Sequence, residues 1–281
     1  MSVTLVTSFS PTGFVAYARR MLESALLHLP KSVDLRIYIE EDSATLLQSG
    51  LDFTGRHVRV ENLLAIPGGA RDFLAKHGND KSKCGYRANT FKYDFRHDAV
   101  KFCHKVFAIT HCAREMSKET IKAPHTVLMW LDADSLFFDD VPEGWLESLL
   151  PAPFFLSYLG RPAYTHSDCS FMAFRLTHQH MPEFMARYVG MYTSGRFMQE
   201  RESHDSFLFD ISRREMEQEG KITSYNLSTE QKGHVFIASE LGRYIDTLKG
   251  PRKKFGKSFQ EDLVKPRPEP YWQQMPKRAG M

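Results

Sequence analysis

Apolar and polar residues follow regular patterns from the start of the chain. Residues 3–7 form a short apolar, β-branched run that ends in a turn rich in Ser, Pro and Gly. Apolar residues then recur at helical spacing over 14–29, and Pro30 ends that segment. Residues 33–39 alternate between apolar and polar, as in a strand with one covered face. Strand, helix and strand joined by short links predict a parallel sheet with crossover helices.

The rest of the chain continues this pattern around one irregular region. Residues 50–93 contain several Gly and Pro turns and predict a long loop region with short helices, of a length that usually covers a site. Beyond it, the periodicity predicts helices at 97–116, 143–150, 182–192 and 204–217, and strands at 127–131, 154–158, 170–174 and 222–226. The expected fold class is α/β, with a mostly parallel sheet flanked by helices.

Composition places the chain among ordinary globular proteins. It has 281 residues, of which 42% are hydrophobic and 25% charged, so one large domain with a substantial core is possible. No stretch approaches the roughly 20 apolar residues of a membrane helix. The four cysteines are scattered without a close pair, which predicts reduced thiols and a cytoplasmic protein.

Charge is unevenly distributed along the chain. The formal net charge is only +3, too small for a general nucleic-acid binder. Residues 249–281 carry nine Lys or Arg against three Asp or Glu, so they contribute +6 and the rest of the chain −3. We expect a domain over residues 1–250 and a basic extension over 251–281 that is irregular or wraps over it. Such an end indicates an anionic ligand or a solvated tail.

Two carboxylates follow the apolar strand predicted at 127–131. Asp132 and Asp134 lie at i and i+2, where side chains on extended backbone point the same way. Ligands of open α/β sheets bind beyond the carboxyl ends of strands. Because two carboxylates beside a core need a partner for their charge, the pair predicts Mg²⁺ or Mn²⁺, which prefer carboxylate and phosphate oxygens. Apolar residues on both sides disfavour the alternative of a simple polar loop.

The segment Trp130-Leu131-Asp132-Ala133-Asp134-Ser135 resembles the Asp-x-Asp motif of the GT-A glycosyltransferases. The resemblance implies a Rossmann-like GT-A fold, a nucleotide-sugar donor, and a Mn²⁺ or Mg²⁺ ion held by Asp132 and Asp134. Other segments resemble the family in the expected order over most of the chain. They imply that the donor is contacted by Thr7, Ser8, Phe9, Arg96, Lys105 and Asp132.

Towards its end the sequence resembles a narrower group, the retaining glycogenin-like and galactosyltransferase-like enzymes. These close their domain with His-x-x-Gly-x-x-Lys. Gly250 and Lys253 keep that spacing, which implies donor binding by both residues and retention at the anomeric carbon. Thr247 stands where the family has its metal-binding His, so the third ligand could be the Thr247 hydroxyl, Asp246 or water.

Two further carboxylates lie in segments that resemble the surroundings of the reacting sugar, and this implies catalytic roles for Asp168 and Asp205. Asp205 could orient the sugar or stabilise positive character at its reacting carbon. It could instead be a helix N-terminal carboxylate that faces the helix dipole, and Asp168 is open to a similar choice. Lys105 could likewise hold the donor or extend its ammonium from an apolar helix to water.

The sequence therefore predicts a metal-dependent glycosyltransferase of unknown acceptor, with a glycan or small molecule favoured over nucleic acid. A glycosyltransferase that modifies nucleic acid bases would share the metal site, and the basic end keeps it open. A nucleotidyltransferase is disfavoured because the turn at 8–13 has one Gly and no basic residue. A non-enzymatic module that binds nucleotide sugars or glycans would be indicated if no divalent metal bound.

Overall fold

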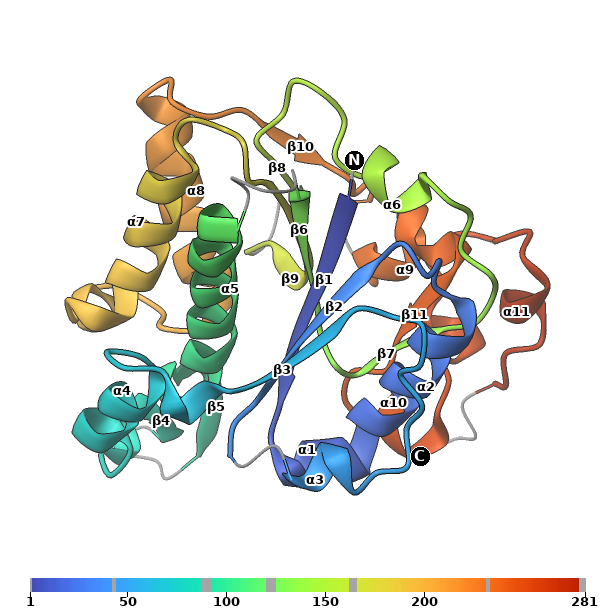
Figure 1. Cartoon of the computed structure of the whole chain (residues 1–281), viewed down its shortest axis with the longest axis horizontal. Helices are drawn as coiled ribbons and strands as arrows, with labels where there is room; N and C mark the ends of the chain where they lie inside the picture. Colours follow the sequence, from blue (N-terminus) through green and yellow to red (C-terminus); the bar gives the residue numbers. More distant parts are fainter. Residues whose placement is uncertain are drawn as a thin grey trace.

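A seven-stranded sheet forms the centre of the molecule. The computed structural model describes residues 2–41, 44–86, 92–119, 125–161, 166–230 and 233–277. The strands lie in the order β10-β8-β9-β6-β1-β2-β3 (Figure 1). Their bounds are β1 Ser2–Phe9, β2 Asp34–Ile39, β3 Val58–Asn62, β6 His125–Leu131, β8 Leu156–Leu159, β9 Asp168–Arg175 and β10 Ser224–Asn226. Within this sheet β9 runs antiparallel to β6 and β8, and the other neighbouring pairs are parallel.

Short paired strands and helices complete the described chain. β4 (Cys84–Tyr86) pairs with β5 (Tyr93–Asp98), and β7 (Ser135–Phe137) pairs with β11 (Ile245–Thr247), both antiparallel. The α-helices are α1 Pro11–Gly13, α2 Arg19–His28, α3 Ala44–Leu47, α4 Ala70–His77, α5 Ala99–Glu119, α6 Trp145–Ser148, α7 Met181–Thr193, α8 Asp205–Gln218, α9 Val235–Ala238, α10 Arg252–Phe255 and α11 Pro270–Gln273. A π-helical segment spans Phe14–Ala18, and 3₁₀ turns span Leu63–Ala65, Lys81–Lys83, Arg196–Met198, Glu240–Arg243 and Gln260–Asp262.

Each face of the sheet packs against its own layer of helices. Figure 1 shows α5, α7 and α8 on one side of the sheet and α2 and α9 on the other. The two-residue period of a strand divides its side chains between the two cores. In β6, Met129 and Leu131 join the core of α2, whereas Leu128 and Trp130 join the core of α5. This alternation places Asp132, the next even position, towards α5.

The arrangement confirms the α/β fold class expected for the GT-A type, with a mostly parallel sheet flanked by helices. The expected loop region at 50–93 also holds β3, an edge strand of the sheet, so that part of the prediction is wrong. Its side chains are half-buried or exposed, which hides the apolar alternation of a strand. The helix expected at 143–150 is a single turn, α6, and the one expected from residue 97 begins at Ala99, after β5.

The segment after Gly250 packs against the body of the protein. Trp272 of α11 is buried in the core that α2 shares with the sheet, and its Nε1 donates a hydrogen bond to the Gly242 carbonyl at 2.6 Å. Residues 278–281 of the expected extension lie outside the described residues. Among the helices described, none is long and apolar enough to cross a membrane, and the four cysteines carry free thiols.

We predict that Trp272→Ala lowers the free energy of unfolding by about 3–5 kcal/mol, because it leaves a large cavity in a shared core. Leu27→Ala is the matched control, since Leu27 is 73% exposed and its loss should change the free energy by about 0.5 kcal/mol or less. Urea denaturation followed by circular dichroism measures both. Equal midpoints for the two variants would mean that the C-terminal segment is not part of the core.

Candidate active site

Several strand ends meet at one edge of the sheet, where they form a cleft of about 780 Å³. The carboxyl ends of β1, β2, β6 and β8 lie there, together with the start of the antiparallel β9. The lining is rich in charge of both signs. Its cations are Lys101, Lys105, Arg161, Lys249, Arg252 and Lys253, and its carboxylates are Glu40, Asp132, Asp134, Asp168 and Asp205.

A turn after β6 presents the first two of these carboxylates. The N–H of Asp132 donates to the Ser170 carbonyl of β9 at 2.9 Å, which holds the strand end in the sheet. The chain then enters β7, which pairs with β11. Just beyond β11, the N–H of Leu248 donates to the Asp134 carbonyl at 2.7 Å. This ladder brings residues 249–253, far away in the sequence, next to the carboxylates.

Lys105 of α5 lies between two carboxylates of the cleft. Its Nζ is 2.7 Å from Asp132 Oδ1 and 2.7 Å from Asp205 Oδ2, and it donates to the Cys169 carbonyl at 2.8 Å. Burial alone would lower the pKa of Lys105, but Asp132 and Asp205 raise it above its ordinary value. The side chain is 12% exposed. The alternative that Lys105 extends its ammonium to water is therefore wrong.

Asp205 is the first residue of α8 and is almost fully buried. Its second oxygen, Oδ1, lies 3.8 Å from His204 Nδ1. Burial would raise the pKa of Asp205, but Lys105 and then His204 hold it below its ordinary value. The residue thus lies at a helix N-terminus and also lines the cleft, so both interpretations of the sequence describe its position.

Asp168 begins β9 and is held by two cations. Lys249 Nζ lies 2.9 Å from its Oδ1, and Arg161 Nη2 lies 2.5 Å from its Oδ2. The Ser170 hydroxyl and N–H also donate to Asp168 Oδ1. Burial would raise the pKa of Asp168, but Lys249 and Arg161 hold it well below its ordinary value. The carboxylate is therefore ionised at neutral pH.

Asp134 pairs with a cation through one of its two oxygens. Its Oδ2 lies 3.1 Å from Lys253 Nζ, which also lies 4.2 Å from the centre of the Tyr17 ring. Its Oδ1 is buried and makes no hydrogen bond with any described residue. The pKa of the neighbouring Tyr17 is raised to about 12, first by burial and then by the negative charges of Asp134, Glu40 and Asp132. This shift indicates an acidic environment. An unpaired oxygen beside a second carboxylate fits a divalent cation.

The other predicted donor contacts divide into two groups. Ser8 and Gly250 line the cleft. Thr7 and Phe9 are buried within β1, each 2% exposed, and are not among the lining residues. Arg96 lies in β5, where its guanidinium pairs with a neighbouring carboxylate at 2.8 Å and does not line the cleft.

The two side chains named as possible third ligands lie beneath the cleft. Thr247 is fully buried in β11, and its hydroxyl makes no hydrogen bond with the described part of the chain. Asp246 is also fully buried, and its carboxylate accepts bonds from the Thr247 N–H, from Ser258 N–H and Oγ, and from the Tyr271 hydroxyl. Asp246 therefore anchors the C-terminal segment, and neither side chain is among those that line the cleft.

Gly250 shapes the strip of chain that follows. Its φ is +64°, a left-handed conformation that favours glycine. Because the chain turns at Gly250, Lys249 before the glycine and Lys253 after it both line the cleft.

Several lining residues were absent from the sites predicted from sequence. Arg161 follows β8, and its position after a strand at this edge is the signal that would have identified it. His104 of α5 places Nδ1 3.2 Å from Glu40 at the end of β2. His234 is largely buried, and burial and then Arg252 lower its pKa to about 4. Its neighbours come from distant segments, so no local pattern marks it.

We predict that Lys105→Met lowers the free energy of unfolding by about 3–5 kcal/mol, because it leaves Asp132 and Asp205 facing each other without their cation. In the double variant with Asp205→Asn, the two losses should be less than additive by at least about 0.5 kcal/mol. Arg243→Met is the control: its pair with Glu240 is exposed and should contribute about 1 kcal/mol or less. Strict additivity in urea denaturation would contradict the buried ion pair.

Comparison with known proteins identifies no relative by sequence. No family model matches the chain, and no curated protein matches it. Among solved structures, the apo form of mouse xyloside xylosyltransferase 1 is similar to this chain with a TM-score of 0.46 and 12% sequence identity, over 81% of this chain and 86% of that chain.

Proposed function

We propose that this chain is a metal-dependent glycosyltransferase that uses a nucleotide-sugar donor. The observation that carries the proposal is the pair Asp132 and Asp134 at the carboxyl end of β6, where Asp134 Oδ1 accepts no hydrogen bond from the residues that the structure describes. The pair lies in a cleft of about 780 Å³, a size typical of sites for small molecules and cofactors. This edge of an α/β sheet is also where such folds bind nucleotides.

The strip around Gly250 supports binding of the donor diphosphate. Lys249, Arg252 and Lys253 line the cleft there, and ammonium and guanidinium groups form strong charge-assisted hydrogen bonds with phosphate oxygens. We therefore assign the diphosphate to this strip. On this proposal, residues 251–281 are a basic extension whose first turn completes the donor site of the domain formed by residues 1–250.

When bound, Mn²⁺ or Mg²⁺ held by Asp134 and Asp132 would offset the negative charge that grows on the leaving diphosphate. Asp168 and Asp205 have low pKa values because cations contact them. Ionised, fixed carboxylates suit stabilisation of positive character at the anomeric carbon, and they do not suit protonation of a leaving group. We assign the two residues that electrostatic role.

The spacing of Gly250 and Lys253 supports transfer with retention, as in the retaining enzymes that this part of the sequence resembles. For the acceptor, a glycan or small molecule is favoured. Phe95 and Phe102 line the cleft beside His204, with ring centroids 5.5 and 5.9 Å from the imidazole. Aromatic faces at this position offer a surface for the apolar face of a sugar ring.

We predict that Asp134→Asn lowers the rate of sugar transfer by at least about two orders of magnitude, the scale of a lost preorganised charge. The measurement is release of nucleoside diphosphate from a panel of nucleotide sugars with Mn²⁺. Folding should persist, because the change removes one of two neighbouring negative charges. Asp139→Asn, an exposed position just after β7, is the control with wild-type rate. Full activity of Asp134→Asn in EDTA would refute metal dependence.

We further predict that Lys253→Met weakens binding of a nucleoside diphosphate by about 1.5–3 kcal/mol, the contribution of a hydrogen bond to a charged group. The same variant should bind Mn²⁺ alone at least as tightly as the wild type, because the ammonium that pairs with Asp134 is removed. Lys254→Met is the matched control, since Lys254 is exposed and does not line the cleft. Isothermal titration calorimetry separates the two ligands. Unchanged diphosphate binding would contradict the assigned strip.

A further inference from the structure

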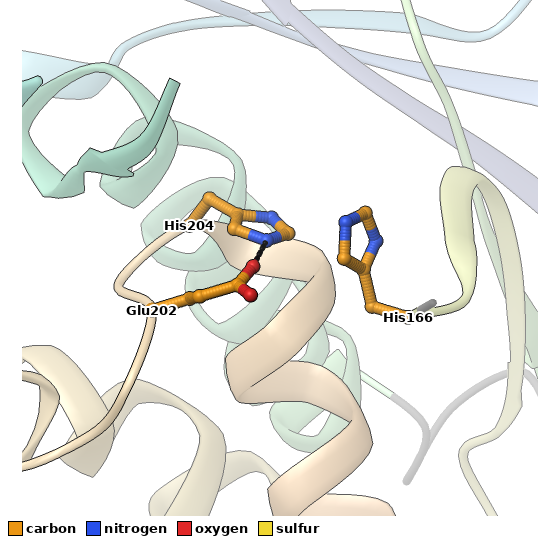
Figure 2. Close-up of side chains that lie close together, drawn as sticks. All are labelled: His166, Glu202 and His204. Carbon is orange, nitrogen blue, oxygen red and sulfur yellow. Dashed lines mark hydrogen bonds and ion pairs between the residues drawn. The ribbon is translucent and has the colours of Figure 1, made fainter. Parts of the chain in front are cut away.

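A second group of potential metal ligands lies at the cleft, formed by His166, Glu202 and His204 (Figure 2). Each residue offers one ligand atom, and these atoms all lie within 4.8 Å of one another. His204 Nε2 is 3.0 Å from Glu202 Oε2, and the two imidazole rings lie 4.2 Å apart, centroid to centroid. His166 and His204 line the cleft.

The side chains come from two separate segments that the fold brings together. His166 lies just before β9, whereas Glu202 and His204 lie just before α8. Glu202 and His204 are buried and His166 is half-buried. In a tetrahedral zinc site, Zn–N distances of about 2.0–2.1 Å put neighbouring ligand atoms about 3.3 Å apart. The three atoms would therefore close around one ion by moving together by about 1.5 Å or less.

We propose that His166, Glu202 and His204 form a binding site for Zn²⁺ or a similar imidazole-binding transition metal. Two imidazole nitrogens and one carboxylate oxygen are a ligand set that occurs in zinc enzymes and suits Zn²⁺ better than Mg²⁺ or Mn²⁺. This set is distinct from the two carboxylates of Asp132 and Asp134, which offer oxygen alone. The two sites are therefore expected to select different ions.

The surroundings of His204 support this role. Its other ring nitrogen, Nδ1, lies 3.8 Å from Asp205 Oδ1, and metal-bound histidines usually direct their second nitrogen to a carboxylate. Arg201 lies 3.3 Å from Oε1 of Glu202, which leaves Oε2 directed towards His204. With three ligands from the protein, a fourth position stays open towards the cleft for water or a substrate hydroxyl.

The test measures metal binding without any enzymatic assay. Protein stripped with EDTA is titrated with Zn²⁺ at neutral pH, and bound metal is counted by mass spectrometry after dialysis. We expect one Zn²⁺ per chain bound to the wild type, and at least about tenfold weaker binding in His166→Ala and Glu202→Gln, because each loses a ligand. Glu202→Gln keeps a hydrogen-bonding group beside His204, and His166 is half-buried, so both variants should fold. Co²⁺ in place of Zn²⁺ should give the visible absorption of a four-coordinate site.

His180→Ala is the matched control, because His180 also lies near a histidine and a glutamate on the surface and should not change Zn²⁺ binding. Asp134→Asn distinguishes failure of this proposal from failure of the proposed sugar transfer. This variant should lose Mn²⁺ binding but should bind Zn²⁺ like the wild type. The proposal is overturned if the wild type binds no stoichiometric Zn²⁺. It is equally overturned if His166→Ala and Glu202→Gln both bind Zn²⁺ like the wild type, or if Asp134→Asn abolishes Zn²⁺ binding.

Discussion

The cleft depends on the pairing of buried carboxylates with cations. Removing a carboxylate from water costs several kcal/mol unless an opposite charge and hydrogen bonds offset the loss. Lys105 meets this requirement for two carboxylates at once, since it contacts both Asp132 and Asp205 at 2.7 Å. α5 supplies that lysine from one face of the sheet, and the chain after β11 supplies Lys249 for Asp168 and Lys253 for Asp134. Elements that lie far apart in the sequence thus meet in one charged network.

This network also suits an anionic ligand that arrives with a cation. Lys249 and Lys253 contact carboxylates in the described structure, so their charges are already offset. On the proposed function, a diphosphate would draw the Lys253 ammonium while a divalent ion takes its place beside Asp134. If Lys249 also turned to the diphosphate, Asp168 would keep its pair with Arg161. The net charge of the cleft then changes little, and neither partner is left buried alone. That balance is a physical reason for a site that holds acidic and basic groups in nearly equal number.

The sequence predicts the parts of this site that depend on local pattern. β6 and its two carboxylates follow from an apolar run and its end, and α5 follows from helical spacing. The edge strand β3 escaped because its side chains are half-buried or exposed. The contact of Lys249 with Asp168 escaped for another reason: the two residues are 81 positions apart in the sequence, and no periodicity encodes which strand ends lie together. The sequence likewise could not show that the Asp246 carboxylate accepts hydrogen bonds from Ser258 and Tyr271 of the C-terminal segment.

A chain of contacts connects the nitrogen-rich and oxygen-rich parts of the cleft. His204 lies beside Asp205, and Lys105 joins Asp205 to Asp132. A cation bound at His204 would add positive charge next to Asp205, which would weaken the pull of that carboxylate on Lys105. Lys105 would then interact more strongly with Asp132 and compete with any ion there. Lys105 therefore connects the two ends of the cleft electrostatically. On the two proposals made above, an ion bound at one end would change the affinity of the other end for its own ion.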